Sequence, residues 1–175
     1  MKKIIFVITC MFFINGYTVA QQKTTINKPN YLEGITSQNA FKEAPYASWF
    51  NRNYDNYKLD EATVKEVKKH IKGITIKAFM GTWCGDSRRE VPHFYKLLEE
   101  IGFDESDLEM IAVNRGKKTA DNLQEGLNII RVPTFIFYKK GKEIGRFVEY
   151  PKEILEKDIL KILKEEPYKH AYDRS

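Results

Sequence analysis

Cys84 is the residue of this sequence best suited to covalent chemistry. It follows Trp83 and opens the run Cys84-Gly85-Asp86-Ser87, which leads into a pattern of apolar residues with helical period. Thiolates attack disulfides, and the N–H groups at the first turn of a helix favour the charged form of a sulfur placed there. The sequence therefore predicts thiol chemistry at this turn.

Three neighbouring side chains would act on that thiol. Ser87, three residues further on, can turn its hydroxyl toward the sulfur and donate a hydrogen bond to a thiolate, but it cannot resolve a disulfide. The Asp86 carboxylate opposes a thiolate charge, whereas Arg88 favours it, and the two effects are of similar size. Asp86 is equally well explained as a first-turn acid that stabilises the start of a helix. The sequence leaves this balance open.

Other catalytic and ligand-binding classes find little support. At 3.6 residues per turn, His93 would lie on the opposite side of the helix from Cys84, which excludes a cysteine-protease pair. His70 and His170 have no partner in the sequence, so we expect neither a metal site nor a bound cofactor. The net charge is +5, with basic residues scattered among acidic ones, which argues against nucleic acid as a partner.

Residues 1–20 have the three parts of a secretory signal peptide. A basic start precedes an apolar run over residues 4–14, and Ala20 supplies a small residue at the cleavage point. The apolar run is shorter than the roughly 20 residues that cross a bilayer. We therefore expect export to the periplasm or the medium, with no membrane span after cleavage. Cleavage removes Cys10 and leaves Cys84 as an unpaired thiol, which in an oxidising compartment must be buried or used.

The rest of the chain predicts one α/β domain over residues 41–175, preceded by a flexible lead-in over residues 21–40. Aromatic residues at helical spacing between Phe41 and Tyr57 indicate an added helical segment that packs on the core. The elements expected after it are a helix capped by Asp60, a strand over 74–80, a helix from Cys84 to Gly102 that contains Pro92, a strand over 108–113, a short helix over 119–127, strands over 134–138 and 143–148, and a helix after Pro151.

Over about residues 74–164 the sequence resembles the thioredoxin family. Four features occur in the order and spacing of that family: Trp83-Cys84-Gly85, Pro92, Arg131-Val132-Pro133-Thr134 and Gly141. The resemblance implies a thioredoxin-like α/β fold, with a central mixed sheet of about four to five strands flanked by helices. It also implies a cis Val132–Pro133 bond and an extended substrate beside Cys84, bound by Trp83, Gly85, Val132, Pro133 and Thr134.

The sequence departs from the two-cysteine turn of that family. Asp86 replaces the turn proline, Ser87 replaces the resolving cysteine, and the family's buried strand aspartate falls at Ala78. Parts that operate the dithiol cycle are therefore absent.

Three functions remain compatible with these residues. The first is a monothiol oxidoreductase with Cys84, Ser87 and Asp86 as its catalytic residues, acting on protein or peptide disulfides with an external thiol as reductant. The second is a non-catalytic thioredoxin-fold module that binds a peptide or protein and carries an inert cysteine. The third is a dimer linked through Cys84. We favour the first, because a free exported thiol at a helix start beside a proline loop is better explained by exchange than by packing.

Overall fold

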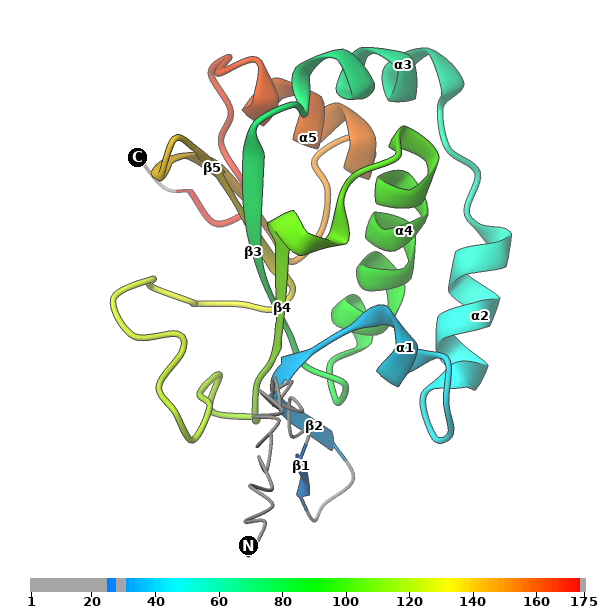
Figure 1. Ribbon diagram of the computed structural model, residues 1–175, viewed down its shortest axis with the longest axis vertical. Helices are drawn as coiled ribbons and strands as arrows, with labels where there is room; N and C mark the ends of the chain where they lie inside the picture. The colour runs from blue at the N-terminus through cyan, green and yellow to red at the C-terminus, as the bar shows by residue number, and fades with distance from the viewer. Residues whose placement is uncertain (1–24, 28–30, 174–175) are drawn as a thin grey trace, which may run out of the picture.

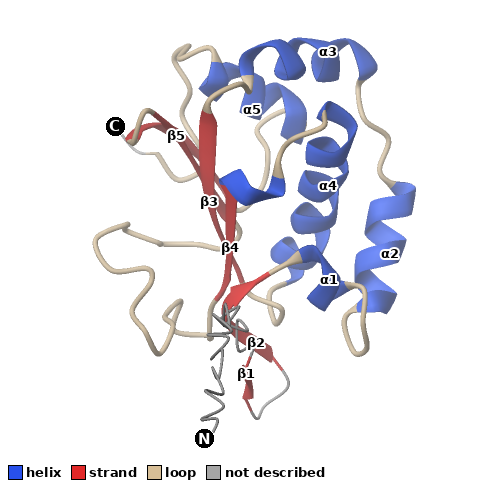
Figure 2. Ribbon diagram, viewed as in Figure 1, coloured by secondary structure: helices blue, strands red, loops and turns tan. Residues whose placement is uncertain are grey.

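Figures 1 and 2 show a twisted sheet with helices packed against it. The computed structural model describes residues 25–27 and 31–173, and the predicted signal peptide, residues 1–20, lies outside these ranges. In chain order the elements are β1 (Thr25–Asn27), β2 (Tyr31–Thr36), α1 (Gln38–Phe41), α2 (Ala47–Asn56), α3 (Glu61–His70), β3 (Ile74–Met80), α4 (Gly85–Ile101), the 3₁₀ turn η1 (Glu105–Asp107), β4 (Leu108–Ala112), β5 (Thr134–Lys139), β6 (Lys142–Val148) and α5 (Leu155–Leu163).

The sheet is mixed and has the strand order β1-β2-β4-β3-β5-β6. β3 and β4 run parallel, as the helical connection α4 between them requires, and the other neighbouring pairs are antiparallel. The expected α/β architecture is confirmed, with β2 to β6 as the central strands and β1 as a short addition at the edge. β3 lies between β4 and β5, so the turn that follows it opens at the centre of the sheet.

One face of the sheet packs against the helices. Side chains alternate along β3, so Ile76 and Met80 point into a large buried cluster that also includes the inner faces of α2, α3, α4 and α5. Phe94 of α4 stacks on Phe135 of β5 with ring centroids 4.1 Å apart. Burial of such large apolar side chains, at about 1.5–3 kcal/mol each, holds α4 in place on the sheet.

Part of the opposite face of the sheet is covered by the segment between β4 and β5, which lies apart from the helices in Figure 2. Leu123 and Leu127 of this segment pack on a smaller buried cluster. The short helix predicted over 119–127 is wrong, because these residues form turns. Asn122 has a φ of 54°, and the Thr119 hydroxyl accepts a hydrogen bond from the Leu123 N–H at 2.9 Å. A left-handed residue and side-chain bonds thus replace the helical ladder.

The expected lead-in over residues 21–40 is wrong for residues 31–36, which form β2. This strand pairs antiparallel with β4, with Thr36 opposite Met110. Gly34, at a φ of 100°, interrupts the strand pattern in the sequence, which explains why the pattern did not reveal it. The sheet therefore begins ahead of the predicted domain boundary at residue 41.

The added helical segment is present but divided into α1 and α2. Pro45 lies between them, and a proline has no N–H for a helical bond and restricts the residue before it. Trp49 and Phe50 of α2 are 7% and 1% exposed, and Phe50 packs edge-on against Tyr95 of α4. The aromatic residues are therefore core, as predicted, and they attach α2 to α4.

Candidate functional site

Cys84 lies at the start of α4, as the sequence predicts. It is the N-cap residue, with an extended backbone, and its carbonyl oxygen accepts the first helical hydrogen bond from the Arg88 N–H at 3.1 Å. Its thiol is partly exposed and donates to the Val132 carbonyl oxygen at a distance of 3.3 Å. The sulfur therefore lies directly beside the backbone of the loop that precedes β5.

Two hydrogen bonds hold that loop in place. The Val132–Pro133 peptide bond is cis, and the Pro133 carbonyl oxygen accepts from the Glu149 N–H at 2.8 Å. The Thr134 hydroxyl, 1% exposed, donates to the Arg131 carbonyl oxygen at 2.7 Å. Buried hydrogen bonds of this kind fix the position of the loop backbone relative to Cys84.

Trp83 forms the other flank of the thiol. Its indole Nε1 donates to the Val113 carbonyl oxygen at 2.8 Å, and the Arg115 guanidinium lies over the ring at 5.5 Å from its centroid. The ring also covers Gly81 so closely that a Cβ at that position would lie 2.6 Å from the indole. A glycine is therefore required for the indole to lie where it does.

Ser87 bonds to the backbone of the turn and not to its predicted partner. Its side chain is fully buried, and its hydroxyl oxygen accepts from the Gly81 N–H at 3.1 Å. The hydrogen bonds of the described residues include none between Ser87 and Cys84. In this structure the hydroxyl therefore stabilises the backbone of the turn.

Asp86 faces solvent and pairs with a neighbour. Its carboxylate lies 2.8 Å from Arg89 Nη2, whose guanidinium also contacts the buried Glu90 at 2.6 Å through Nε. The charge of Asp86 is thus partly compensated by Arg89. This pairing fits a first-turn acid that stabilises the start of α4.

Sequence reasoning missed the hydrogen bonds by which two residues stabilise the turn before Cys84. Arg88, which the sequence suggested only as a charge that favours the thiolate, donates from Nε to the Thr82 carbonyl oxygen at 2.6 Å. Thr82 is 1% exposed, and its hydroxyl oxygen accepts from the Leu32 N–H of β2 at 3.1 Å. The signal for Thr82 was its place in the turn before Cys84, but its partner strand β2 was not expected.

The surface near the proline loop carries exposed apolar and aromatic side chains. Ile130 and Tyr150 are each 42% exposed, and they are the large hydrophobic residues that stand out in this way among the described residues. Tyr150 lies edge-on to Tyr172, and the Arg131 guanidinium lies 4.9 Å from the centroid of the Tyr172 ring. Arg131 thus links this aromatic pair to the loop that contains Pro133.

The family model described as Thioredoxin matches residues 36–164 of the sequence. A thioredoxin-like protein of Acanthamoeba polyphaga mimivirus is 33% identical over 137 residues, which cover 78% of this chain and 81% of that protein. This chain belongs to the thioredoxin family. The thioredoxin of Gallus gallus is 28% identical over 94 residues, which cover 54% of this chain and 84% of that protein.

One solved structure extends the likeness of this thioredoxin-family chain to its overall fold. A protein of unknown function from Pseudomonas aeruginosa superimposes with a TM-score of 0.57, covering 74% of this chain and 92% of that one. The sequence identity is 16%, so the likeness shows a shared fold alone.

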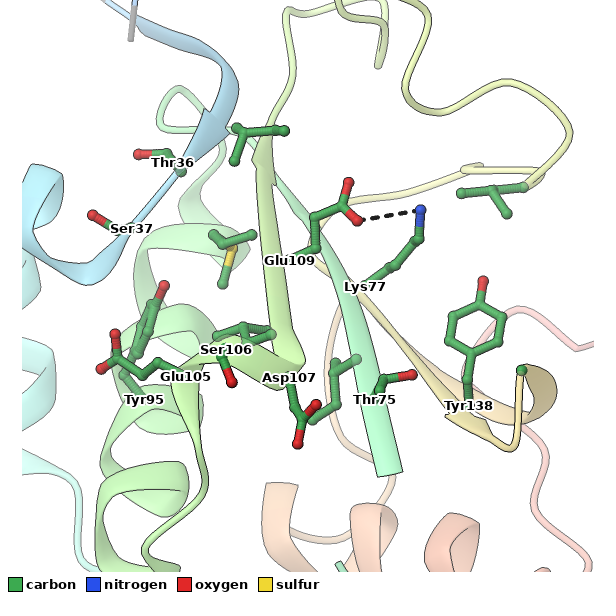
Figure 3. Close-up of a pocket in the computed structure, with 16 residues that line it drawn as sticks. Thr36, Ser37, Thr75, Lys77, Tyr95, Glu105, Ser106, Asp107, Glu109 and Tyr138 are labelled. Atoms are coloured by element: carbon green, nitrogen blue, oxygen red, sulfur yellow. Dashed lines mark ion pairs between the residues drawn. The ribbon is translucent and has the colours of Figure 1, made fainter. Parts of the chain in front are cut away.

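The thioredoxin-family chain also has a hollow that lies away from Cys84 (Figure 3). It has a volume of about 880 Å³ and lies over β3 and β4, where Lys77 and Glu109 form an ion pair at 3.3 Å. Tyr138 and the residues of η1 complete part of its wall, and none of the predicted site residues lines it.

Within the described ranges, no group of three His, Cys, Asp or Glu residues is placed to hold a metal ion, and no helix is long and apolar enough to cross a membrane.

Proposed function

We propose that this protein is an exported monothiol oxidoreductase that exchanges disulfides or mixed disulfides of proteins or peptides through Cys84. The observation that carries the proposal is the position of the Cys84 thiol, partly exposed at the start of α4 and 3.3 Å from the Val132 carbonyl oxygen. A structural cysteine would be expected inside the core, whereas this thiol is accessible beside a rigid loop.

The exchange begins when the Cys84 thiolate attacks one sulfur of a substrate disulfide. A bond forms between Cys84 Sγ and that sulfur, the substrate S–S bond breaks, and the second substrate sulfur leaves as a thiolate that takes up a proton. An external thiol then loses its proton and attacks the substrate sulfur of the mixed disulfide. This step releases Cys84 as a thiolate, and the substrate sulfur leaves joined to the external thiol, so no further oxidant or reductant is needed.

The neighbouring residues take complementary parts in this proposal. Val132, Pro133 and Thr134 would present a fixed backbone edge to an extended substrate, while Trp83 and Gly85 would flank the reacting sulfurs. The exposed Ile130 and Tyr150 would contact apolar side chains of that substrate.

Ser87 and Asp86 would contribute to the proposed reaction in different ways. Ser87 would fix the turn through the Gly81 N–H. Because a hydroxyl cannot attack the mixed disulfide, release would depend on the external thiol. Asp86, held by Arg89, would place a carboxylate at the edge of the site.

The test is to capture the mixed disulfide. The mature protein is incubated with a peptide disulfide that carries a chromophoric leaving thiol, and the covalent adduct is measured by mass spectrometry beside a Cys84→Ser control. We expect one adduct per chain, released by added small thiol, and none with the control. The protein should release the chromophoric thiol from the peptide disulfide faster than free cysteine does at the same pH.

The outcome also decides between the alternatives. Tight peptide binding without an adduct would replace this proposal with the non-catalytic binding module. A Cys84-linked dimer on non-reducing electrophoresis that resists small thiols would favour a structural disulfide between two chains.

Export rests on residues 1–20 of the sequence, which have the composition of a signal peptide. Expression of the full chain in a bacterium, followed by mass determination of the periplasmic and medium fractions, should give a product that begins at Gln21. A full-length product retained inside the cell would contradict this part of the proposal.

A further inference from the structure

Pro92 removes one backbone hydrogen bond from α4. A proline has no N–H, so the carbonyl oxygen four residues before it lacks its helical donor. In α4 that oxygen belongs to Arg88. This carbonyl oxygen lies at an exposed position, so it must accept a hydrogen bond either from water or from a donor elsewhere in the fold.

The replacement comes from the added helix α2. The side-chain amide of Asn53 donates through Nδ2 to the Arg88 carbonyl oxygen at 2.9 Å, and also to the Trp49 carbonyl oxygen of its own helix at 2.9 Å. Figure 1 shows α2 running alongside α4, and this arrangement places the Asn53 amide within reach of the Arg88 carbonyl oxygen. Asn53 therefore replaces the bond that Pro92 cannot make.

α2 is itself firmly attached to α4. Lys96 of α4 donates through Nζ to the carbonyl oxygens of Tyr54 and Tyr57, at 2.9 and 2.7 Å, at the carboxyl end of α2. The Tyr54 hydroxyl also donates to Glu99 at 2.5 Å. These contacts, with the aromatic packing between the two helices, fix the position from which Asn53 reaches α4.

Arg88 connects this contact to the thiol. Its N–H donates to the Cys84 carbonyl oxygen at 3.1 Å, its Nε donates to the Thr82 carbonyl oxygen at 2.6 Å, and its own carbonyl oxygen accepts from Asn53. One residue thus holds both sides of the turn that ends at Cys84. Leu32 of β2 adds a further bond to the Thr82 hydroxyl.

We propose that Asn53 and Arg88 are positioning residues for Cys84, so that the N-terminal elements β2 and α2 form part of the thiol site. α2 supplies the donor that Pro92 lacks, and this bond fixes the position of Arg88. Arg88 in turn fixes the position of the Cys84 sulfur relative to the Val132 carbonyl oxygen. The consequence for exchange rests on the proposed function of Cys84, but the positioning itself is measurable without it.

The test uses Pro92 as a switch. In a Pro92→Ala variant, residue 92 regains an N–H that can donate to the Arg88 carbonyl oxygen, so Asn53 is no longer needed there. Asn53→Asp keeps the shape of the side chain but removes the donor while its carboxylate is ionised. Asn51→Asp, at an exposed position on the same helix, is the matched control.

The first measurement is hydrogen exchange at the Arg88 amide, which bonds the Cys84 carbonyl oxygen. We expect Asn53→Asp to lower its protection by about twofold or more, the lower end of coupling within one hydrogen-bond network, and Asn51→Asp to leave it unchanged. In the Pro92→Ala background the effect of Asn53→Asp should disappear. Equal effects in both backgrounds, or equal effects of the two Asn variants, would overturn the proposal.

The second measurement compares two reactions of Cys84. Exchange with a peptide disulfide requires the sulfur to be aligned with the Val132 loop, whereas alkylation by a small reagent requires only access. Asn53→Asp should lower the ratio of the two rate constants by about twofold or more, and Pro92→Ala should abolish this loss.

The two measurements separate the possible failures. A wild-type protein that is alkylated but never exchanges disulfides defeats the proposed function and leaves the exchange-protection result to decide the positioning role. If Asn53→Asp does not fold in the wild-type background, the folded Pro92→Ala double variant still tests whether Asn53 is dispensable there. An unfolded double variant would count against the proposal.

Discussion

Gly81→Ala is the substitution that most directly tests the packing of the thiol turn. A Cβ at residue 81 would lie 2.6 Å from Cε2, 2.8 Å from Nε1 and 2.9 Å from Cζ2 of Trp83. These are ring atoms of a side chain hydrogen-bonded to the Val113 carbonyl oxygen, so the indole cannot swing away without losing that bond. Overpacking costs about 1–3 kcal/mol and a lost hydrogen bond about 0.5–1.5 kcal/mol. We expect a loss of about 1.5–4.5 kcal/mol in the free energy of unfolding.

Gly85→Ala is the matched control for this substitution. A Cβ at residue 85 meets nothing within 4 Å, and alanine is favoured over glycine within a helix by up to about 1 kcal/mol. Urea denaturation should therefore show Gly81→Ala destabilised and Gly85→Ala unchanged or slightly stabilised. The indole N–H resonance of Trp83 should move in the first variant alone. A Gly81→Ala protein with wild-type stability and an unmoved indole resonance would refute the described packing of Trp83.

Three further predictions concern polar groups that are buried or partly buried. Ser87→Ala should destabilise the fold by about 1–3 kcal/mol in urea denaturation, because it leaves the Gly81 N–H without its acceptor; wild-type stability would contradict the observed bond. Glu156→Gln should cost a similar amount, since the fully buried Glu156 carboxylate accepts from the Tyr57 hydroxyl at 2.6 Å and from the Asp60 N–H at 2.7 Å, whereas the exposed Glu166→Gln should be neutral. Burial lowers the pKa of His170 below 6.5, more than Asp173 raises it, so NMR titration should give a midpoint below 6.5. Its stabilising contribution is full above pH 6.5 and declines as the pH falls toward the folded-state pKa, because the unfolded chain binds the proton first; a midpoint at or above 6.5 would contradict this.

The order of elements from α3 onward was largely predictable, because each element carries its own local signal. Asp60 accepts from the Thr63 N–H as an N-cap should, and Gly102 ends α4 in the left-handed conformation. The turn at Lys140 and Gly141 joins β5 to β6 as the sequence predicts. Caps, periodicity and turn residues act within a few positions of each other, so one sequence reveals them.

Elements that depend on distant partners were harder to predict. The apolar spacing of Leu123 and Leu127 fits a helix equally well, but Thr119 and Asn122 divert the backbone into turns. β2 exists because it pairs with β4, more than 70 residues away in sequence. The residues around Gly34 show no local pattern that predicts the pairing of β2 with β4.

The same division applies inside the site. Spacing placed Ser87 one helical turn from Cys84, and that proximity suggested a bond from its hydroxyl to the sulfur. A hydroxyl forms the bonds that its surroundings offer, and here the Gly81 N–H approaches it inside the turn. Sequence distance predicts which groups are neighbours, whereas the direction of a buried hydroxyl depends on every donor around it.

Pro92 shows how a sequence can pose a structural question without answering it. A proline within a predicted helix identifies one carbonyl oxygen, that of Arg88, that needs a donor from elsewhere. Which residue supplies it depends on how α2 lies against α4, and that is decided by aromatic packing and by Lys96. Asn53 lies 35 residues before Arg88 and carries no motif of its own. A residue of this kind becomes visible only when every unpaired backbone group of a functional helix is followed to its partner.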